Sequence, residues 1–313
     1  VIDKIIEKIR HGIQKLLGQL PHLCKEIYKL LITGKGWLVI AVVVFITIFI
    51  CNSQKVIYSD DEKKKDEYYQ EYGGKDYSGF TEIIELRKAE VKEAAEGEID
   101  ENTVSKYVYN YMDSTRLLDS MNEYMEQINY VEEVNAQYGI EAYVMSQRGY
   151  NQILGDNAKI RKLIIYIILG FGIVLIAESE NALEYKSGMN MLLGSSARGR
   201  IWGKAVKSGA VCIIAAIIAV IVNITEMSVM SHTYGMPYID APLISLSFMK
   251  VGKMLRYITI KQYMIMQLGV YILYSLLVSI ETMAVSRYIF KKNSNREVPL
   301  LIVLNTIVLF III

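Results

Sequence analysis

The side chains that most often carry enzyme chemistry are few and scattered in this sequence. The histidines and cysteines are His11, His22, His232, Cys24, Cys51 and Cys212. None of their spacings matches the short intervals that hold a zinc ion. The chain also contains no GxxxxGK[ST] phosphate-binding loop, and the cluster Gly194, Ser195 and Ser196 follows a helical pattern rather than a strand. We therefore expect no catalytic residue, no cofactor-binding residue and no metal ligand in this chain.

Carboxylates are abundant, but only one of them occupies a position that is unusual for an acid. Glu281 lies near the inner end of the apolar run 263–286. An ionisable residue inside a membrane segment is a functional candidate by default. Its place close to the interface leaves simple solvation as the favoured alternative. The acidic run Asp60, Asp61 and Glu62 is expected to be a solvated linker.

Five apolar runs dominate the remainder of the sequence. They span residues 37–51, 163–177, 209–224, 263–286 and 298–313. A helix needs about 20 apolar residues to cross a bilayer core, and several runs are shorter, so a single run could be a buried core helix. Five in one chain favour an all-α membrane protein with at least five transmembrane helices. The chain begins with Val1 and ends inside an apolar run, so we expect it to be part of a longer protein. An odd number of spans implies a sixth one if the C-terminus of that protein is cytoplasmic.

Basic residues near the spans predict their orientation, because Lys and Arg are enriched in cytoplasmic segments. The predicted organisation is cytoplasmic amphipathic and connecting helices at 1–35, transmembrane helices at 36–52, 159–177, 208–225, 262–286 and 298–313, an extracellular helical domain at 53–158, a cytoplasmic coupling loop at 178–207, an extracellular interfacial segment at 226–261 and a cytoplasmic loop at 287–297. Two basic patches disagree with this orientation, and because both flank spans we expect their long side chains to snorkel to the interface. They are Lys159, Arg161 and Lys162, and Lys250, Lys253, Arg256 and Lys261.

The predicted extracellular domain at 53–158 is strongly acidic, with 23 acidic and 11 basic residues. Between 104 and 138 an apolar stripe at helical spacing predicts a helical hairpin or short coiled coil. The stripe consists of Tyr107, Tyr111, Leu118, Met121, Met125 and Ile128. Core packing is the favoured role for the tyrosines of this segment, and a binding surface is the alternative.

Three further patterns give structural expectations. Residues 1–20 predict a basic amphipathic helix on the inner membrane face, with a partner-binding helix as the alternative. Residues 240–260 predict an interfacial helix that begins at Asp240, Ala241 and Pro242. Gly170 and Gly172, inside the second span, are expected to permit close helix packing.

The segment 178–204 places acids, a glycine-interrupted helical pattern and a group of basic residues between two apolar runs. With its flanks it resembles the cytoplasmic loop of ABC-2 type (type V) transporter permeases, in which an acid ends the second span and a short coupling helix, a turn and basic residues follow. EIYKLLITGKGW at 26–37, APLISL at 241–246 and ITIKQYMIM at 258–266 resemble the segments that precede the first and fourth spans of that family. The positions that correspond to its ATPase-coupling interface are Glu178, Leu183, Glu184, Gly188, Met191, Leu192, Arg198, Arg200 and Lys204.

This resemblance implies a permease subunit of an ATP-driven exporter in a bacterial plasma membrane. It implies a separate ATP-binding subunit that holds ATP and Mg²⁺, a second identical or homologous permease and contact with membrane lipid. Nucleic acid is not an expected partner. The substrate would be a peptide, an antibiotic or a lipid-like molecule. The alternative is a non-transporting membrane sensor or scaffold that acts through the extracellular helical domain.

Overall fold

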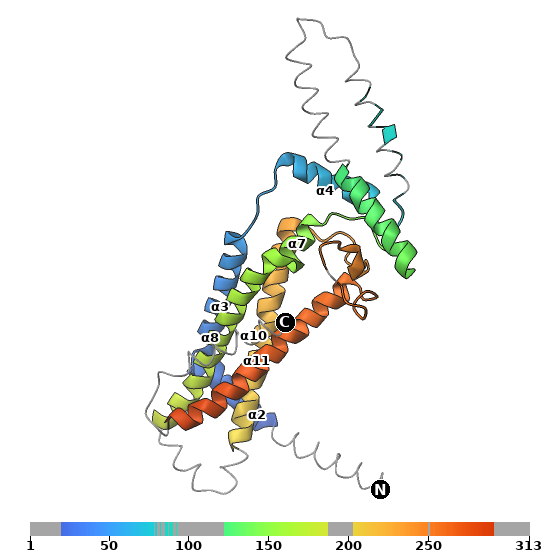
Figure 1. Ribbon diagram of the computed structural model, residues 1–313. Coiled ribbons are helices and arrows are strands. Elements are labelled where there is room, and N and C mark those ends of the chain that lie inside the picture. Colours follow the sequence, from blue (N-terminus) through green and yellow to red (C-terminus); the bar gives the residue numbers. More distant parts are fainter. Residues whose placement is uncertain are drawn as a thin grey trace, which may run out of the picture. The chain divides into compact units, whose positions relative to one another are not determined.

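The computed structural model describes residues 20–77, 79, 82, 85–86, 88–89, 92, 122–186, 203–249 and 251–290. Within these residues every regular element is a helix, which confirms the all-α prediction for this part of the chain (Figure 1). The predicted fifth span, nearly all of the amphipathic segment 1–20 and the stripe from Tyr107 to Met121 lie outside the described residues. The chain divides into two compact units. We call Val1–Gln54, Lys159–Met230 and Met266–Ile313 the span unit, and Lys55–Ala158 with Ser231–Ile265 the intervening unit.

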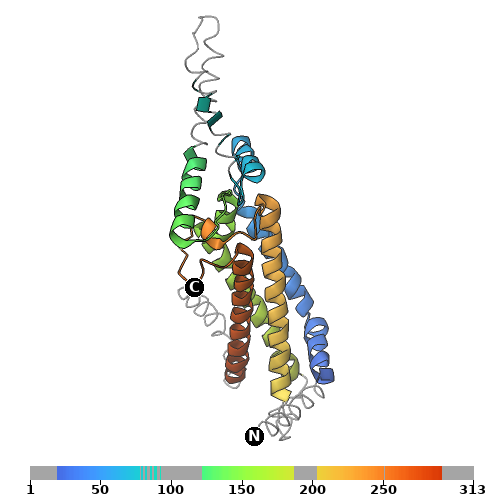
Figure 2. The same ribbon diagram turned by 90° about the vertical axis from the view of Figure 1, so that its right-hand side faces the viewer.

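Four helices of the described chain are long and apolar enough to cross a membrane. They are α3 (Gly36–Ser53), α8 (Asp156–Lys186), α10 (Lys204–Tyr234) and α11 (Ile260–Phe290) (Figures 1 and 2). Each contains one of the first four predicted apolar runs, so those runs are helical as expected. The helices α8 and α10 extend well past the predicted spans, and they shorten the predicted coupling loop at both of its ends.

Close packing between α3 and α8 depends on a glycine. A Cβ atom added at Gly172 would come within 2.7 Å of Val43 Cγ2, a distance that no relaxed contact allows. The prediction that Gly172 permits close helix approach is therefore confirmed. The helix α2 (Leu20–Tyr28) and the π-helical turn η1 (Lys29–Thr33) lead into α3, and Leu30 of that turn is fully buried.

The intervening unit is built around α4 (Asp60–Tyr72), a helix over 122–138 and α7 (Arg148–Leu154). Buried side chains of the first two helices, among them Tyr69, Tyr124 and Ile128, form its core with Val144. The expectation of a linker at Asp60–Glu62 is wrong. Ser59 caps α4 by accepting the Glu62 N–H, and the Glu62 carboxylate accepts the Ser59 N–H at 2.7 Å. This reciprocal capping box starts a helix where composition alone indicated a linker.

The expectation of an interfacial helix over 240–260 is also wrong. The described residues there form turns, a single 3-10 turn (Leu243–Ser245, η4) and an isolated antiparallel bridge between Pro242 and Thr259. The Leu243 N–H donates to Ile258 O at 2.8 Å, and the Ile260 N–H donates to Ala241 O at 3.0 Å. These two bonds join segments that are about 15–20 residues apart in the sequence, and they use backbone groups that a helix would need for its own i to i−4 hydrogen bonds.

Candidate functional site

The structure describes four of the nine predicted coupling residues. Glu178 is half-buried on α8, and Leu183 and Glu184 belong to the last turns of that helix. Lys204 is exposed and is the first residue of α10. The other five, Gly188, Met191, Leu192, Arg198 and Arg200, lie outside the described residues. Glu281, the other acid considered from the sequence, has an exposed side chain on α11.

A buried charge cluster joins three of the apolar helices of the span unit. Arg161 of α8 is 1% exposed and Glu226 of α10 is 0% exposed. The Arg161 Nε donates to Glu226 Oε1 at 3.0 Å, and the Tyr271 hydroxyl of α11 donates to Glu226 Oε2 at 2.6 Å. Both oxygens of the carboxylate are therefore engaged, each by a different helix. We refer to Arg161, Glu226 and Tyr271 as the charge cluster.

Further polar and aromatic contacts surround the charge cluster. Lys162 Nζ donates to Gln267 Oε1 at 3.1 Å, which adds a direct polar link between α8 and α11. The ring of Tyr166 stacks on that of Tyr271 with centroids 4.6 Å apart, and it meets the ring of Tyr274 edge-on at 5.0 Å. The Tyr274 hydroxyl in turn donates to Tyr166 O. The three helices are thus held together here by side chains with defined geometry.

Because the charge cluster is buried, its contribution to stability depends on how well its charges are paired. Moving a charged side chain from water into the protein interior costs on the order of several kcal/mol. The attraction of an oppositely charged partner offsets this cost only when the geometry of the pair is good and its hydrogen bonds are satisfied. Glu226 meets this condition through Arg161 and Tyr271 together. Among the described residues no group of His, Cys, Asp and Glu side chains could hold a metal ion. The arrangement fixes the mutual register of α8, α10 and α11 at one level of the bundle.

Sequence reasoning missed this cluster, and its expectation for Arg161 is wrong. Arg161 was expected to extend toward the interface, whereas its side chain is buried against Glu226. Glu226 lies just beyond the predicted end of the third span at 225. The missed signal is that it is the only acid in the 31 residues of α10. A lone acid on one apolar helix and an arginine on another are candidates for a buried pair.

The charge cluster and the connecting segment 187–203 lie at opposite ends of the same two helices. From Arg161 to the end of α8 at Lys186 the rise of an α-helix gives about 38 Å, and from Lys204 to Glu226 of α10 about 33 Å. Either length exceeds the hydrocarbon thickness of a bilayer, about 30 Å. The Arg161–Glu226 bond shows that the start of α8 lies beside the end of α10. The two helices therefore form an antiparallel pair, tied by this bond at one end and by the chain itself at the other.

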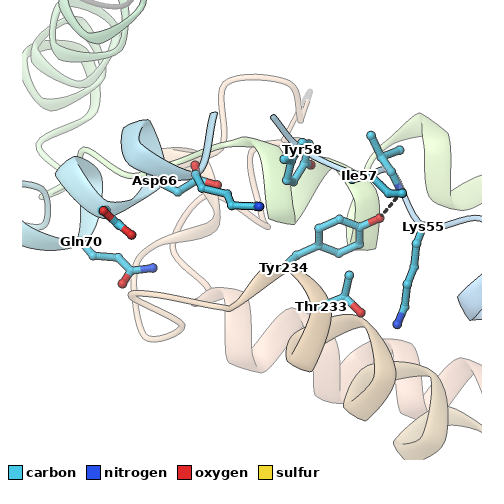
Figure 3. A pocket seen from close by; sticks show the side chains of 10 residues that line it. Lys55, Ile57, Tyr58, Asp66, Gln70, Thr233 and Tyr234 are labelled. Carbon is cyan, nitrogen blue, oxygen red and sulfur yellow. Dashed lines mark hydrogen bonds between the residues drawn. The ribbon is translucent and has the colours of Figure 1, made fainter. Parts of the chain in front are cut away.

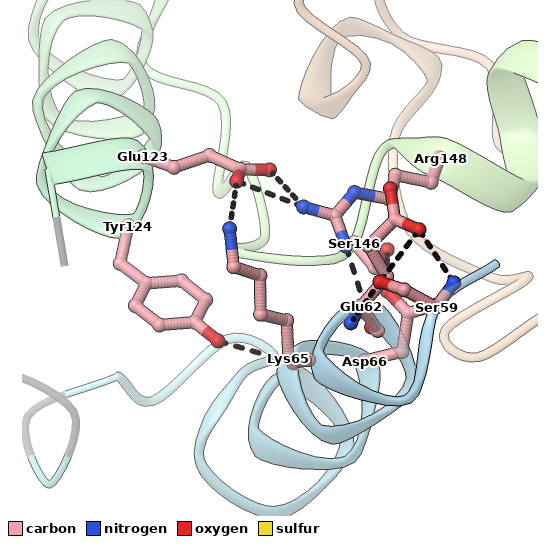
Figure 4. Close-up of polar contacts among 8 residues, drawn as sticks. All are labelled: Ser59, Glu62, Lys65, Asp66, Glu123, Tyr124, Ser146 and Arg148. Carbon is pink, nitrogen blue, oxygen red and sulfur yellow. Dashed lines mark hydrogen bonds and ion pairs between the residues drawn. The ribbon is translucent and has the colours of Figure 1, made fainter. Parts of the chain in front are cut away.

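The intervening unit contains a second network of charges, drawn in Figure 4. Arg148 Nη2 donates to both oxygens of Glu123, at 2.9 and 3.2 Å, and Lys65 Nζ donates to Glu123 Oε2 at 3.2 Å. The Ser146 hydroxyl donates to Asp66 Oδ1 at 2.5 Å. These bonds tie α4 and the helix over 122–138 to the start of α7.

Two carboxyl groups of this network have pKa values that move in opposite directions. Burial raises the pKa of Asp66 above its usual value, and the Ser146 hydrogen bond offsets only part of that effect. Hydrogen bonds from the Ser59 backbone and hydroxyl lower the pKa of Glu62. Desolvation thus dominates at Asp66, and hydrogen bonding dominates at Glu62.

No protein-family model, no curated protein and no solved structure matches this chain.

Proposed function

We propose that this chain is the membrane-spanning subunit of an ATP-driven exporter of a bacterial plasma membrane. A separate ATP-binding subunit contacts the segment 178–204, and a second permease, identical or homologous, completes the translocation path. ATP and Mg²⁺ belong to the partner subunit. The exported substrate is a peptide, an antibiotic or a lipid-like molecule.

The observation that carries this proposal is the geometry of α8 and α10. These two helices flank the segment whose sequence resembles a coupling loop, and the charge cluster joins them about 33–38 Å away. A displacement of the segment would move both helices together, since packed helices behave as rigid elements with few alternative arrangements. The cluster would transmit that movement to α11 through Tyr271. ATP-driven motion on one side would thereby reach residues at the far end of the bundle.

The first test is the composition of the complex. The tagged chain is purified in mild detergent from its native host, and the proteins that accompany it are identified. A stoichiometric ATP-binding subunit is the expected result. Recovery of the chain without such a subunit would contradict the proposal and would favour a sensor or scaffold that acts through the intervening unit.

The second test addresses the segment itself. Leu192→Asp is expected to abolish stimulation of the partner's ATPase in a reconstituted complex, because an apolar contact with a partner groove would become a buried charge. Membrane insertion is expected to be unaffected. Met254→Asp is the matched control, since Met254 is 92% exposed in the intervening unit and lies far from the segment in the sequence. Unchanged stimulation by the Leu192 variant would remove the coupling role from this segment.

A further inference from the structure

The intervening unit contains a cavity whose lining residues carry charges of both signs. Its volume is about 380 Å³, within the range of roughly 300–1,000 Å³ that is typical of small-molecule sites. Two short pieces of chain and one helix line it: residues 55–58, the part of α4 from Lys63 to Gln70, and the last two residues of α10. We refer to this space as the α4 cavity.

Charges of both signs line the α4 cavity. Lys55 and, from α4, Lys63 contribute ammonium groups, and α4 also contributes the carboxylates of Asp66 and Glu67. In Figure 3 Asp66 and Gln70 lie on one side of the Tyr234 ring, and Lys55 lies on the other. A ligand that carries a negative group and a positive group on one short framework would satisfy both sides at once.

Two tyrosine rings give the cavity an aromatic wall. The ring centroids of Tyr58 and Tyr234 are 5.5 Å apart, with their planes tilted by 59°. The Tyr234 hydroxyl accepts the Val56 N–H at 2.8 Å, which fixes the ring beside the cavity. Burial raises the pKa of Tyr58 to about 12, so this hydroxyl stays neutral at physiological pH. Neutral tyrosine rings offer their faces to a cation.

The position of the cavity along the chain indicates where its ligand comes from. Lys55 follows α3, which ends at Ser53, and Thr233 and Tyr234 end α10, so the cavity lies where two candidate spans terminate. Tyrosine is enriched at this level of membrane proteins, beside the lipid headgroups. Ile57, a lining residue, has a side chain that is 93% exposed, and Val56 is 44% exposed. Exposed apolar side chains at the end of a span are suited to contact the acyl boundary of a lipid layer.

We propose that the α4 cavity binds the headgroup of a zwitterionic phospholipid that has a primary ammonium group, as phosphatidylethanolamine does. Lys55 binds the phosphate. Glu67, with Asp66 beside it, accepts hydrogen bonds from the ammonium group, which packs against Tyr58 and Tyr234. Ile57 contacts the upper part of the acyl chains. This binding site does not depend on the coupling role of residues 178–204, and it would be present in a transporter or in a sensor.

The test measures binding of short-chain lipids to the full chain in detergent by native mass spectrometry. The probes are dihexanoyl phosphatidylethanolamine, the corresponding phosphatidylcholine and phosphatidylglycerol, free phosphoethanolamine and triglycine. We expect the phosphatidylethanolamine to bind most tightly. Phosphatidylcholine has no N–H donor for Glu67, and phosphatidylglycerol has no cation.

Two variants and two matched controls complete the design. Lys55→Gln and Glu67→Gln are each expected to weaken phosphatidylethanolamine binding about tenfold, the loss typical of one charge-assisted hydrogen bond. Lys253→Gln and Glu71→Gln remove the same charges from exposed positions outside the cavity and are expected to leave binding unchanged.

Three outcomes would overturn the proposal. Equal affinity of the unaltered protein and both cavity variants would show that the lipid binds elsewhere on the surface of the spans. Tighter binding of free phosphoethanolamine than of the lipid would assign the cavity to a soluble ligand. Tighter binding of triglycine than of any lipid would assign it to a peptide.

Discussion

The two units of this chain each contain an Arg–Glu pair at nearly the same distance, and the pairs differ in their exposure to water. Arg161 and Glu226 of the span unit are 3.0 Å apart and 1% and 0% exposed. Arg148 and Glu123 of the intervening unit are 2.9 Å apart and 19% and 43% exposed. Nearly equal distances do not imply equal contributions to stability, because the cost of an unpaired charge depends on how much water remains around it.

The difference in burial also sets what each pair requires from its neighbours. Glu226 needs a donor on each carboxylate oxygen, and Tyr271 supplies the second. Glu123 receives donors from Arg148 and Lys65, yet water can replace either of them at an exposed carboxylate. The buried pair is therefore sensitive to the loss of one member, whereas the exposed pair is tolerant.

The largest expected effect comes from removal of one acid from each pair. Glu226→Ala should lower the free energy of unfolding by about 3–5 kcal/mol, because it leaves Arg161 as a buried charge without its carboxylate. Glu123→Ala should cost about 0.2–1 kcal/mol. Both values are measurable by denaturant titration of the purified protein in detergent. Similar losses in the two variants would contradict the distinction between the pairs.

Replacement of the whole charge cluster tests whether it is needed for stability. The free energy of unfolding of the triple variant Arg161→Met, Glu226→Leu, Tyr271→Phe should equal that of the unaltered chain or exceed it by up to about 4 kcal/mol. The reason is that well-packed apolar side chains avoid the desolvation cost of the buried charges. The same titration measures it. A triple variant less stable than Glu226→Ala would show that packing rather than charge dominates at this level of the bundle.

The next comparison is between two single hydrogen bonds, one donated by a tyrosine hydroxyl in each unit. Tyr271→Phe should cost about 1.5–3 kcal/mol, because the hydroxyl donates to a buried charged group. Tyr124→Phe removes a hydroxyl that donates to Lys65 O at 3.2 Å and should cost about 0.5–1.5 kcal/mol. Unfolding of the two variants side by side measures the difference. The reverse order would mean that the acceptor's burial does not control the strength of these bonds.

The smallest expected effect is a pH dependence in the intervening unit. The pKa of Asp66 is higher in the folded chain than its usual value of 3.8, so the folded state binds the proton more tightly. Between those two values stability falls as the pH rises, because the unfolded state then holds fewer protons than the folded one. Asp66→Asn should remove this fall and keep an acceptor for Ser146.

The control for this prediction is a nearby acid with the opposite shift. The pKa of Glu62 is lowered on folding, so its contribution to stability is lost as the pH falls. Glu62→Gln should flatten the acid side of the stability profile, whereas Asp66→Asn should flatten the decline above pH 3.8. Profiles of the two variants that coincide would contradict the opposite shifts.

The positions of the long helices could be predicted from the sequence, whereas contacts between distant segments could not. The apolar runs predict α3, α8, α10 and α11, since a continuous apolar stretch must be buried in protein or lipid and a helix satisfies its own backbone. Gly172 is predicted as a packing position for a different local reason, because a residue without a side chain lets two helices approach closely. The prediction of a helix over 240–260 is wrong, because the apolar residues have helical spacing but the backbone hydrogen bonds run between Ala241–Leu243 and Ile258–Ile260. Periodicity cannot report hydrogen bonds between distant residues.

The sequence by itself determined where the long helices run, because hydropathy and helix formation are properties of neighbouring residues. Only the tertiary structure determined that Arg161, Glu226 and Tyr271 meet, and that Lys55, Glu67 and Tyr234 line one cavity. Each of these groups draws its members from segments far apart in the chain. The charges of the first group are stable in the protein interior because their partners lie within hydrogen-bond distance, and those of the second group can bind a ligand because they face one cavity. The fold determines both the burial of these side chains and the distances between them.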